Sequence, residues 1–260
     1  MRAEKVKSKG DWALAGFCAF ALALAPLSGA FATTPPNSAP SDVMNEFLQG
    51  ANGVQPDQAG AHRQSDPHAG LGAEKMAQVA LQHLDESRPQ MAFETLNVAI
   101  GRYPDSVMLL SIRASLFLQT QQTSLALADL NRALAINPHD PVLLTNRAQA
   151  LRQFGRPDDA LRDLDQAIQF DSNFVAAYFN RGSLHYEAAR FEQALTDFNR
   201  CIELEPEAPA GYFNRASTYD ALGKRERAIG DLKYFLTLPA EPAWQQIARD
   251  MLQQWDTGKS

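Results

Sequence analysis

Arginine and aspartate recur along this chain at a fixed spacing. Each of four arginines at position i has an aspartate at position i+16, and both series follow a 34-residue period. The residues are Arg113, Arg147, Arg181 and Arg215, with Asp129, Asp163, Asp197 and Asp231. Because a guanidinium matches a carboxylate in charge and geometry, the spacing predicts one structural ion pair per repeat. The alternative is that the arginine row binds an acidic ligand.

The histidines and cysteines show no pattern that would support catalysis. None of the five histidines is spaced with a second ligand as a metal site on one helix requires. They are His62, His68, His83, His139 and His185. The sequence also has no nucleophile elbow, no phosphate-binding loop and no paired cysteines. We therefore expect no metal, no cofactor and no enzymatic activity, with a cryptic hydrolase as the alternative.

Small residues follow the same 34-residue step. One row holds Ala80, Ala114, Ala148, Gly182 and Ala216, and a second row, twelve residues later, holds Ala92, Ala126, Ala160, Ala194 and Ala228. Prolines such as Pro104, Pro138 and Pro206 mark where a helix should stop at the end of a period. The predicted units are 73–106, 107–140, 141–174, 175–208 and 209–242. Each unit contains two helical stripes, at unit positions 4, 7, 8 and 11 and at 20, 23, 24 and 27.

A 34-residue helix-turn-helix unit with small residues at the helix crossing resembles the tetratricopeptide repeat. The resemblance implies an all-α fold, an α-solenoid of five units. A further amphipathic helix at 243–256 is expected to cap the last unit. The repeated arginine and aspartate, at unit positions 7 and 23, are equidistant from the bend near position 15. We therefore expect each pair at one level of a hairpin and partly desolvated, with a link to the next unit left open.

The resemblance also implies that the first helix of each unit lines a concave binding surface. Asparagine recurs at position 6 in units three to five, which resembles the asparagine ladder of O-linked N-acetylglucosamine transferase. Such amides complement a peptide backbone. The predicted peptide-binding groove comprises Asn146, Asn180, Asn214, Phe179, Phe213, Tyr186, Thr145 and Gln149. In the alternative, the asparagines bond to neighbouring backbone and the phenylalanines pack between units.

A second binding mode of the family is matched only in part. The carboxylate clamp of heat-shock cochaperones uses lysine, arginine and asparagine at set positions, and this chain matches only the asparagine. A free C-terminal carboxylate is therefore not the expected target.

Residues 1–32 have the pattern of a secretory signal peptide. A basic head precedes an apolar run at 12–27, and Ala30 and Ala32 supply the small residues for cleavage after Ala32. The alternative is an uncleaved anchor, because 12–32 is uncharged over nearly a spanning length. Membrane contact is expected only through such an uncleaved N-terminus.

Residues 33–72 are rich in Pro, Ser and Gly and predict a disordered linker. Within the linker, Val43, Phe47 and Leu48 would share one face of a transient helix or docking peptide at 41–48. The other interpretation of 41–48 is plain linker.

The charge of the chain disfavours nucleic acid as a partner. The formal net charge is -6, and removal of 1–32 takes away four basic and two acidic residues, which leaves -8. Cys201 would then be the remaining cysteine, expected as a small buried hydrophobe.

The sequence as a whole predicts an exported, non-enzymatic adaptor or scaffold that binds a protein or peptide segment. Its place would be the periplasm if the source is a Gram-negative bacterium, and its role would lie in envelope assembly. The alternatives are a self-assembling structural homo-oligomer and a non-catalytic subunit of an envelope enzyme complex.

Overall fold

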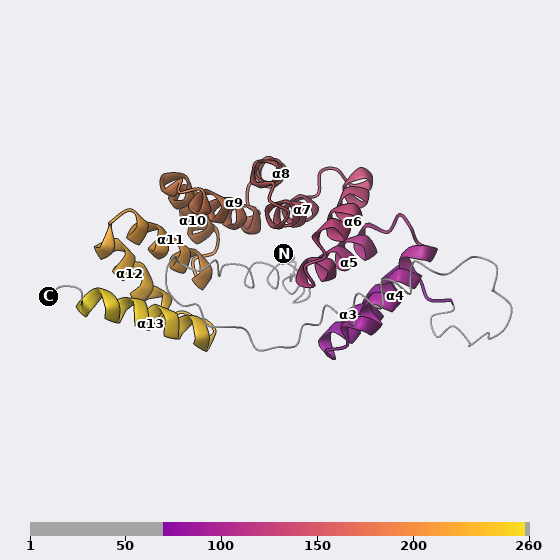
Figure 1. The fold of residues 1–260 in the computed structure, drawn as a ribbon, viewed down its shortest axis with the longest axis horizontal. Helices are drawn as coiled ribbons and strands as arrows, with labels where there is room; N and C mark the ends of the chain where they lie inside the picture. The colour runs from indigo at the N-terminus through magenta and orange to yellow at the C-terminus, as the bar shows by residue number, and fades with distance from the viewer. Residues whose placement is uncertain (1–69, 258–260) are drawn as a thin grey trace, which may run out of the picture. The chain divides into compact units, whose positions relative to one another are not determined.

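A computed structural model describes residues 70–257, and every regular element in this range is an α-helix (Figure 1). The helices are α3 (Ala73–Asp85), α4 (Pro89–Arg102), α5 (Val107–Gln119), α6 (Thr123–Ile136), α7 (Pro141–Gln153), α8 (Pro157–Phe170), α9 (Val175–Glu187), α10 (Phe191–Leu204), α11 (Pro209–Ala221), α12 (Arg225–Phe235) and α13 (Pro242–Thr257). The predicted all-α class is confirmed. The predicted signal peptide and residues 33–69 of the predicted linker lie outside the described range.

The helices pack as five consecutive pairs, from α3 with α4 to α11 with α12. Each second helix also contacts the first helix of the following pair, and each first helix contacts the next first helix. The first helices therefore form one continuous row, which is the row that the family resemblance assigns to ligand binding. Helix α13 contacts α12 and follows the last pair. Within the described range, no helix is both long and apolar enough to cross a membrane.

Helix starts reflect local sequence. Each of the five first helices begins at the first position of its predicted unit. The Asp140 carboxylate caps α7, because its Oδ1 accepts from the backbone N–H groups of Val142 and Leu143 at 2.9 and 3.2 Å. Proline stands at the first position of other helices, such as Pro89 in α4 and Pro157 in α8. Its fixed φ suits the first turn, where its missing N–H costs nothing.

The bend inside every unit has the same backbone conformation. At unit position 15 the chain takes a positive φ of 55–78° in all five units, at Ser87, Gln121, Gly155, Ala189 and Gly223. Two backbone hydrogen bonds accompany each bend, as in unit one, where Arg88 donates to His83 at 2.7 Å and Ser87 donates to Leu84 at 2.9 Å. This is the Schellman pattern that ends a helix. Glycine relieves the left-handed strain in two of the five bends.

The core lies where the two helices of each unit cross. Alanines of the two small-residue rows are almost completely buried, as expected for close helix approach. Unit four differs, because Gly182 replaces alanine and Phe198 replaces the leucine that the other units hold at position 24. A larger side chain on one helix is thus matched by a smaller one on the other.

Candidate protein-binding surface and the ion-pair ladder

Each repeated arginine makes a two-pronged ion pair with the aspartate of its own unit. The Nε and Nη2 groups donate to the two carboxylate oxygens at 2.7–3.0 Å. The pairs are Arg113 with Asp129, Arg147 with Asp163, Arg181 with Asp197, and Arg215 with Asp231. The structure brings the two side chains together because positions 7 and 23 face each other across the antiparallel pair.

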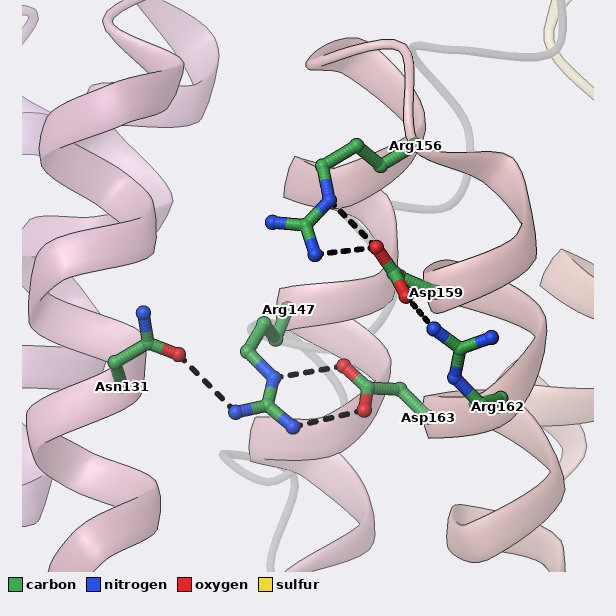
Figure 2. Close-up of polar contacts among 6 residues, drawn as sticks. All are labelled: Asn131, Arg147, Arg156, Asp159, Arg162 and Asp163. Carbon is green, nitrogen blue, oxygen red and sulfur yellow. Dashed lines mark hydrogen bonds and ion pairs between the residues drawn. The ribbon is translucent and has the colours of Figure 1, made fainter.

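A third donor of each arginine reaches the preceding unit. Nη1 donates at 2.7–3.1 Å to the side chain at unit position 25, which is Asn97, Asn131, Asp165 and Asn199 in turn. Figure 2 shows Arg147 between Asp163 of its own unit and Asn131 of the unit before. The arginine is therefore linked backward, to the preceding unit. We call these twelve residues the ion-pair ladder.

Sequence reasoning missed the position-25 residues, although a signal was present. Asparagine or aspartate recurs there in units one to four and gives way to Lys233 in the last unit. No repeat unit follows Lys233 to supply an arginine. At the other end of the array, the first unit has Val79 in place of the arginine and no unit precedes it.

The ladder is largely shielded from water. The aspartate side chains are 3–11% exposed and the arginine side chains 17–27%. Aromatic rings cover three of the guanidinium groups, with a ring centroid 5.6 Å away, at Phe117, Tyr178 and Tyr212. Hydrogen bonds to Asp197 and Asp165 raise the pKa of Arg181 against the opposing effect of burial. These contacts make the ladder an internal support and leave no open row of arginines for an acidic ligand.

The asparagines of the predicted groove are oriented by their own helices. Nδ2 of Asn180 donates to the carbonyl of Ala176 at 2.8 Å, and Nδ2 of Asn214 donates to Ala210 at 2.9 Å. Asn146 occupies the equivalent position on α7, and all three side chains are half-buried. The backbone bonding that we considered as an alternative is thus present at two of the three positions.

The aromatic residues of the predicted groove pack into the array. Phe179 is 8% exposed and lies edge-on to Phe198, with ring centroids 6.1 Å apart. Phe213 contacts Phe235 and the capping residue Trp244, at 5.4 and 5.0 Å between centroids. The prediction that these two rings line apolar pockets beside the asparagines is corrected, because their surface is used for packing between helices.

The remaining predicted groove residues are also partly withdrawn. Thr145 and Gln149 are buried, and Tyr186 is half-buried against Phe191, with ring centroids 5.5 Å apart. Burial is the main cause of the raised pKa of the Tyr186 phenol. The half-buried Ser183, which sequence analysis did not single out, lies on α9 at the position of Gln149 on α7. Its hydroxyl donates to the Phe179 carbonyl at 2.8 Å.

Two reactive residue types have structural surroundings. Cys201 is buried, its thiol lies 3.7 Å from the Val175 carbonyl, and burial raises its pKa. His185 accepts a hydrogen bond at Nδ1 from Nε of Arg190 at 3.1 Å, and burial lowers its pKa. Among residues 70–257, no cluster of three or more potential metal ligands is present.

Antiparallel helix pairs stacked in one direction define an α-solenoid, a class of repeat protein that binds partners along an extended surface. Residues 145–209 and 179–242 each match the family model for the tetratricopeptide repeat. The chain is thus a tetratricopeptide-repeat protein, and such repeats serve as protein-interaction scaffolds. No curated protein sequence matches it.

Similar solved structures share this fold. One is a tetratricopeptide-repeat protein from Parabacteroides merdae, with a TM-score of 0.63, 23% identity, and coverage of 73% of this chain and 75% of that chain. A thermophilic repeat protein from Thermus thermophilus has a TM-score of 0.61, 16% identity, and coverage of 70% and 100%. The type IV pilus biogenesis factor PilW has a TM-score of 0.60, 19% identity, and coverage of 64% and 76%. At these identities the likeness shows the fold alone.

Proposed function

We propose that this protein is a non-enzymatic adaptor that holds an extended protein segment against the first helices of units three to five. The contact surface centres on Asn146, Asn180 and Asn214. The proposal gives the interaction scaffold a particular binding surface and a particular form of ligand.

The orientation of the asparagine amides carries the proposal. A primary amide has two N–H donors and one carbonyl acceptor. In Asn180 and Asn214 the carbonyl four residues earlier takes one N–H, at 2.8 and 2.9 Å. The second N–H and Oδ1 then form a donor–acceptor edge, which matches the C=O and N–H of a peptide backbone. Because the first bond holds the rotamer, less side-chain freedom is lost when a ligand binds.

The interior of the array supports the same assignment. The ion-pair ladder uses its charged groups internally, so the asparagine row is left to bind by neutral hydrogen bonds. A ligand recognised through its backbone needs no particular charge. This favours an extended protein segment over an acidic small molecule.

We place the adaptor outside the cytoplasm, in envelope assembly. The basic head and apolar run of residues 1–27 support export. A repeat fold similar to that of the type IV pilus biogenesis factor PilW is consistent with a role in the envelope. Detection of the chain in a periplasmic extract, with an N-terminus after Ala32, is the expected result, and a cytoplasmic full-length chain would overturn this part.

Site-specific photocrosslinking in cells tests the binding surface. Ala176, one turn before Asn180 on α9, would carry the photoreactive group, and Gln193 on α10 of the same unit is the control position. We expect a specific protein to be captured from Ala176 and not from Gln193. The same set captured from both positions would contradict the proposal.

The asparagines are then tested by substitution in the chain that carries the probe at Ala176. A hydrogen bond contributes about 1 kcal/mol, so Asn180→Ala with Asn214→Ala should lower capture roughly tenfold. Gln166→Ala, on the exposed side of α8, is the matched control and should leave capture unchanged. Unchanged capture in the double variant, with an unchanged far-UV circular dichroism spectrum, would refute the role of the asparagines.

A further inference from the structure

The second helices of the first two units expose an apolar patch that the later units lack. Met91 and Val98 of α4 are 42% and 41% exposed, and Leu125 of α6, at the unit position of Met91, is 40% exposed. We call these three residues the outer patch. The same two unit positions in units three and four hold Asp159, Gln166, Gln193 and Arg200. The apolar character is therefore a property of this end of the array and not of the repeat.

The opposite end of the array is covered by a helix of the same chain. In α13, Ala248 and Trp255 are buried, and Trp244 packs on Phe213 at 5.0 Å between ring centroids. Solenoids need such covers because their end units have no neighbour on one side. The first unit also departs from the repeat, since Val79 and Thr95 stand where the other units carry the arginine and aspartate of the ladder.

We propose that residues 41–49 of this chain form a short amphipathic helix that docks on the outer patch and joins the N-terminal segment to the first unit. At the helical period, all four large apolar residues of this stretch fall on one side. They are Val43, Met44, Phe47 and Leu48. The polar residues Asp42, Asn45, Glu46 and Gln49 fall on the other side. Ser41 suits an N-cap, and Gly50 suits the position after the last turn.

The connecting chain is long enough to reach the patch. Residues 50–72 separate this stretch from α3, and a flexible segment of that length spans about 26 Å on average. Helix α4, with 14 residues, is about 21 Å long. Its C-terminal end lies beside the start of α3, where Nη1 of Arg102 is 3.9 Å from Sδ of Met76. Val98 is one turn from that end, so docking within one chain requires no stretching.

The charges around the patch fit the same occupant. Arg132 is exposed on α6, seven residues after Leu125 and thus on the same face. Asp42 and Glu46, on the polar side of the 41–49 helix, carry the opposite charge. The apolar contact supplies the affinity, and the charges favour one orientation.

A cysteine-pair experiment on the protein as cells produce it tests this docking. In a background with Cys18→Ser and Cys201→Ala, Phe47→Cys is combined with Val98→Cys, or with Gln166→Cys as the matched control at the same unit position in unit three. After mild oxidation we expect at least tenfold more intramolecular disulfide with residue 98 than with residue 166. Equal yields would indicate random collisions of a flexible tail and would overturn the proposal.

Two further measurements separate the occupants. Mixing chains that carry only Phe47→Cys with chains that carry only Val98→Cys should give little cross-linked dimer, and a dimer as the main product would assign the patch to a second copy instead. Leu48→Asp should lower the intramolecular yield at least fivefold, whereas Asn45→Asp, on the polar side, should not. A yield unaffected by Leu48→Asp would exclude apolar docking. None of these outcomes depends on ligand binding at the asparagines.

Discussion

Gly182 faces the ring of Phe198, and a Cβ at residue 182 would lie 2.9 Å from Cε1 of that ring. The other four units pair alanine at this position with leucine at position 24. The glycine in unit four is therefore explained by the larger side chain on the facing helix. It is a compensated exchange within one hairpin.

Gly182→Ala should destabilise the array by about 1–3 kcal/mol, because overpacking forces the ring or the helix to move. Adding Phe198→Leu restores the combination found in the other units, so the double variant should lose less stability than Gly182→Ala alone. Urea unfolding followed by circular dichroism measures both. Gly230→Ala in α12 is the control: no atom lies within 4 Å of its Cβ position, and helix propensity predicts a gain of about 0.5–1 kcal/mol.

Breaking one ladder pair should cost more than breaking a surface pair. The Asp197 side chain is 3% exposed, so Arg181→Ala leaves a carboxylate in the interior, and we expect a loss of about 3 kcal/mol. The exposed pair of Arg200 and Glu203 should contribute about 1 kcal/mol or less. A double-mutant cycle on Arg181 and Asp197, measured by urea unfolding, gives the coupling. A coupling near zero would refute the structural role of the pair.

The position-25 side chains should couple neighbouring units. Asn199→Ala removes the acceptor for Nη1 of Arg215, now at 2.7 Å, and leaves a half-buried donor unpaired, at a cost of about 1–2 kcal/mol. Hydrogen exchange should show faster opening at the junction of α10 and α11. Lys233→Asn is the matched control, because no repeat unit follows the fifth, and its effect should stay within about 0.5 kcal/mol. An equal effect of both substitutions would contradict the link.

Stability should fall as the pH drops below about 6.5, the ordinary pKa of histidine. Burial is the main cause of the lowered pKa of His185, to which Arg190 and Arg181 add, while Asp197 and Asp165 oppose it. A lowered native pKa means that the unfolded chain binds the proton more readily, so the stability present above pH 6.5 is lost on acidification. His185→Gln should reduce the decline between pH 7 and 5 in thermal unfolding. An identical decline in the variant would show that another group is responsible.

Much of the fold was predictable from the sequence because a repeat array depends on local contacts. The 34-residue step placed the helices, and the compensating changes at Gly182 and Phe198 could be noticed as two exceptions in the same unit. The ion-pair residues were identifiable because positions 7 and 23 vary together, both charged in four units and both changed in the first. Contacts within one hairpin leave such a trace because they recur from unit to unit.

The sequence by itself thus determined the repeat, the helical pairs and the partners Arg181 and Asp197 within a unit. Only the tertiary structure decided how the units meet: that Nη1 of arginine reaches backward to position 25, and that Phe179 and Phe213 turn inward. The reason is physical. Helical periodicity assigns a side chain to a face, but its exposure and its hydrogen-bond partner depend on the neighbouring helix that covers that face.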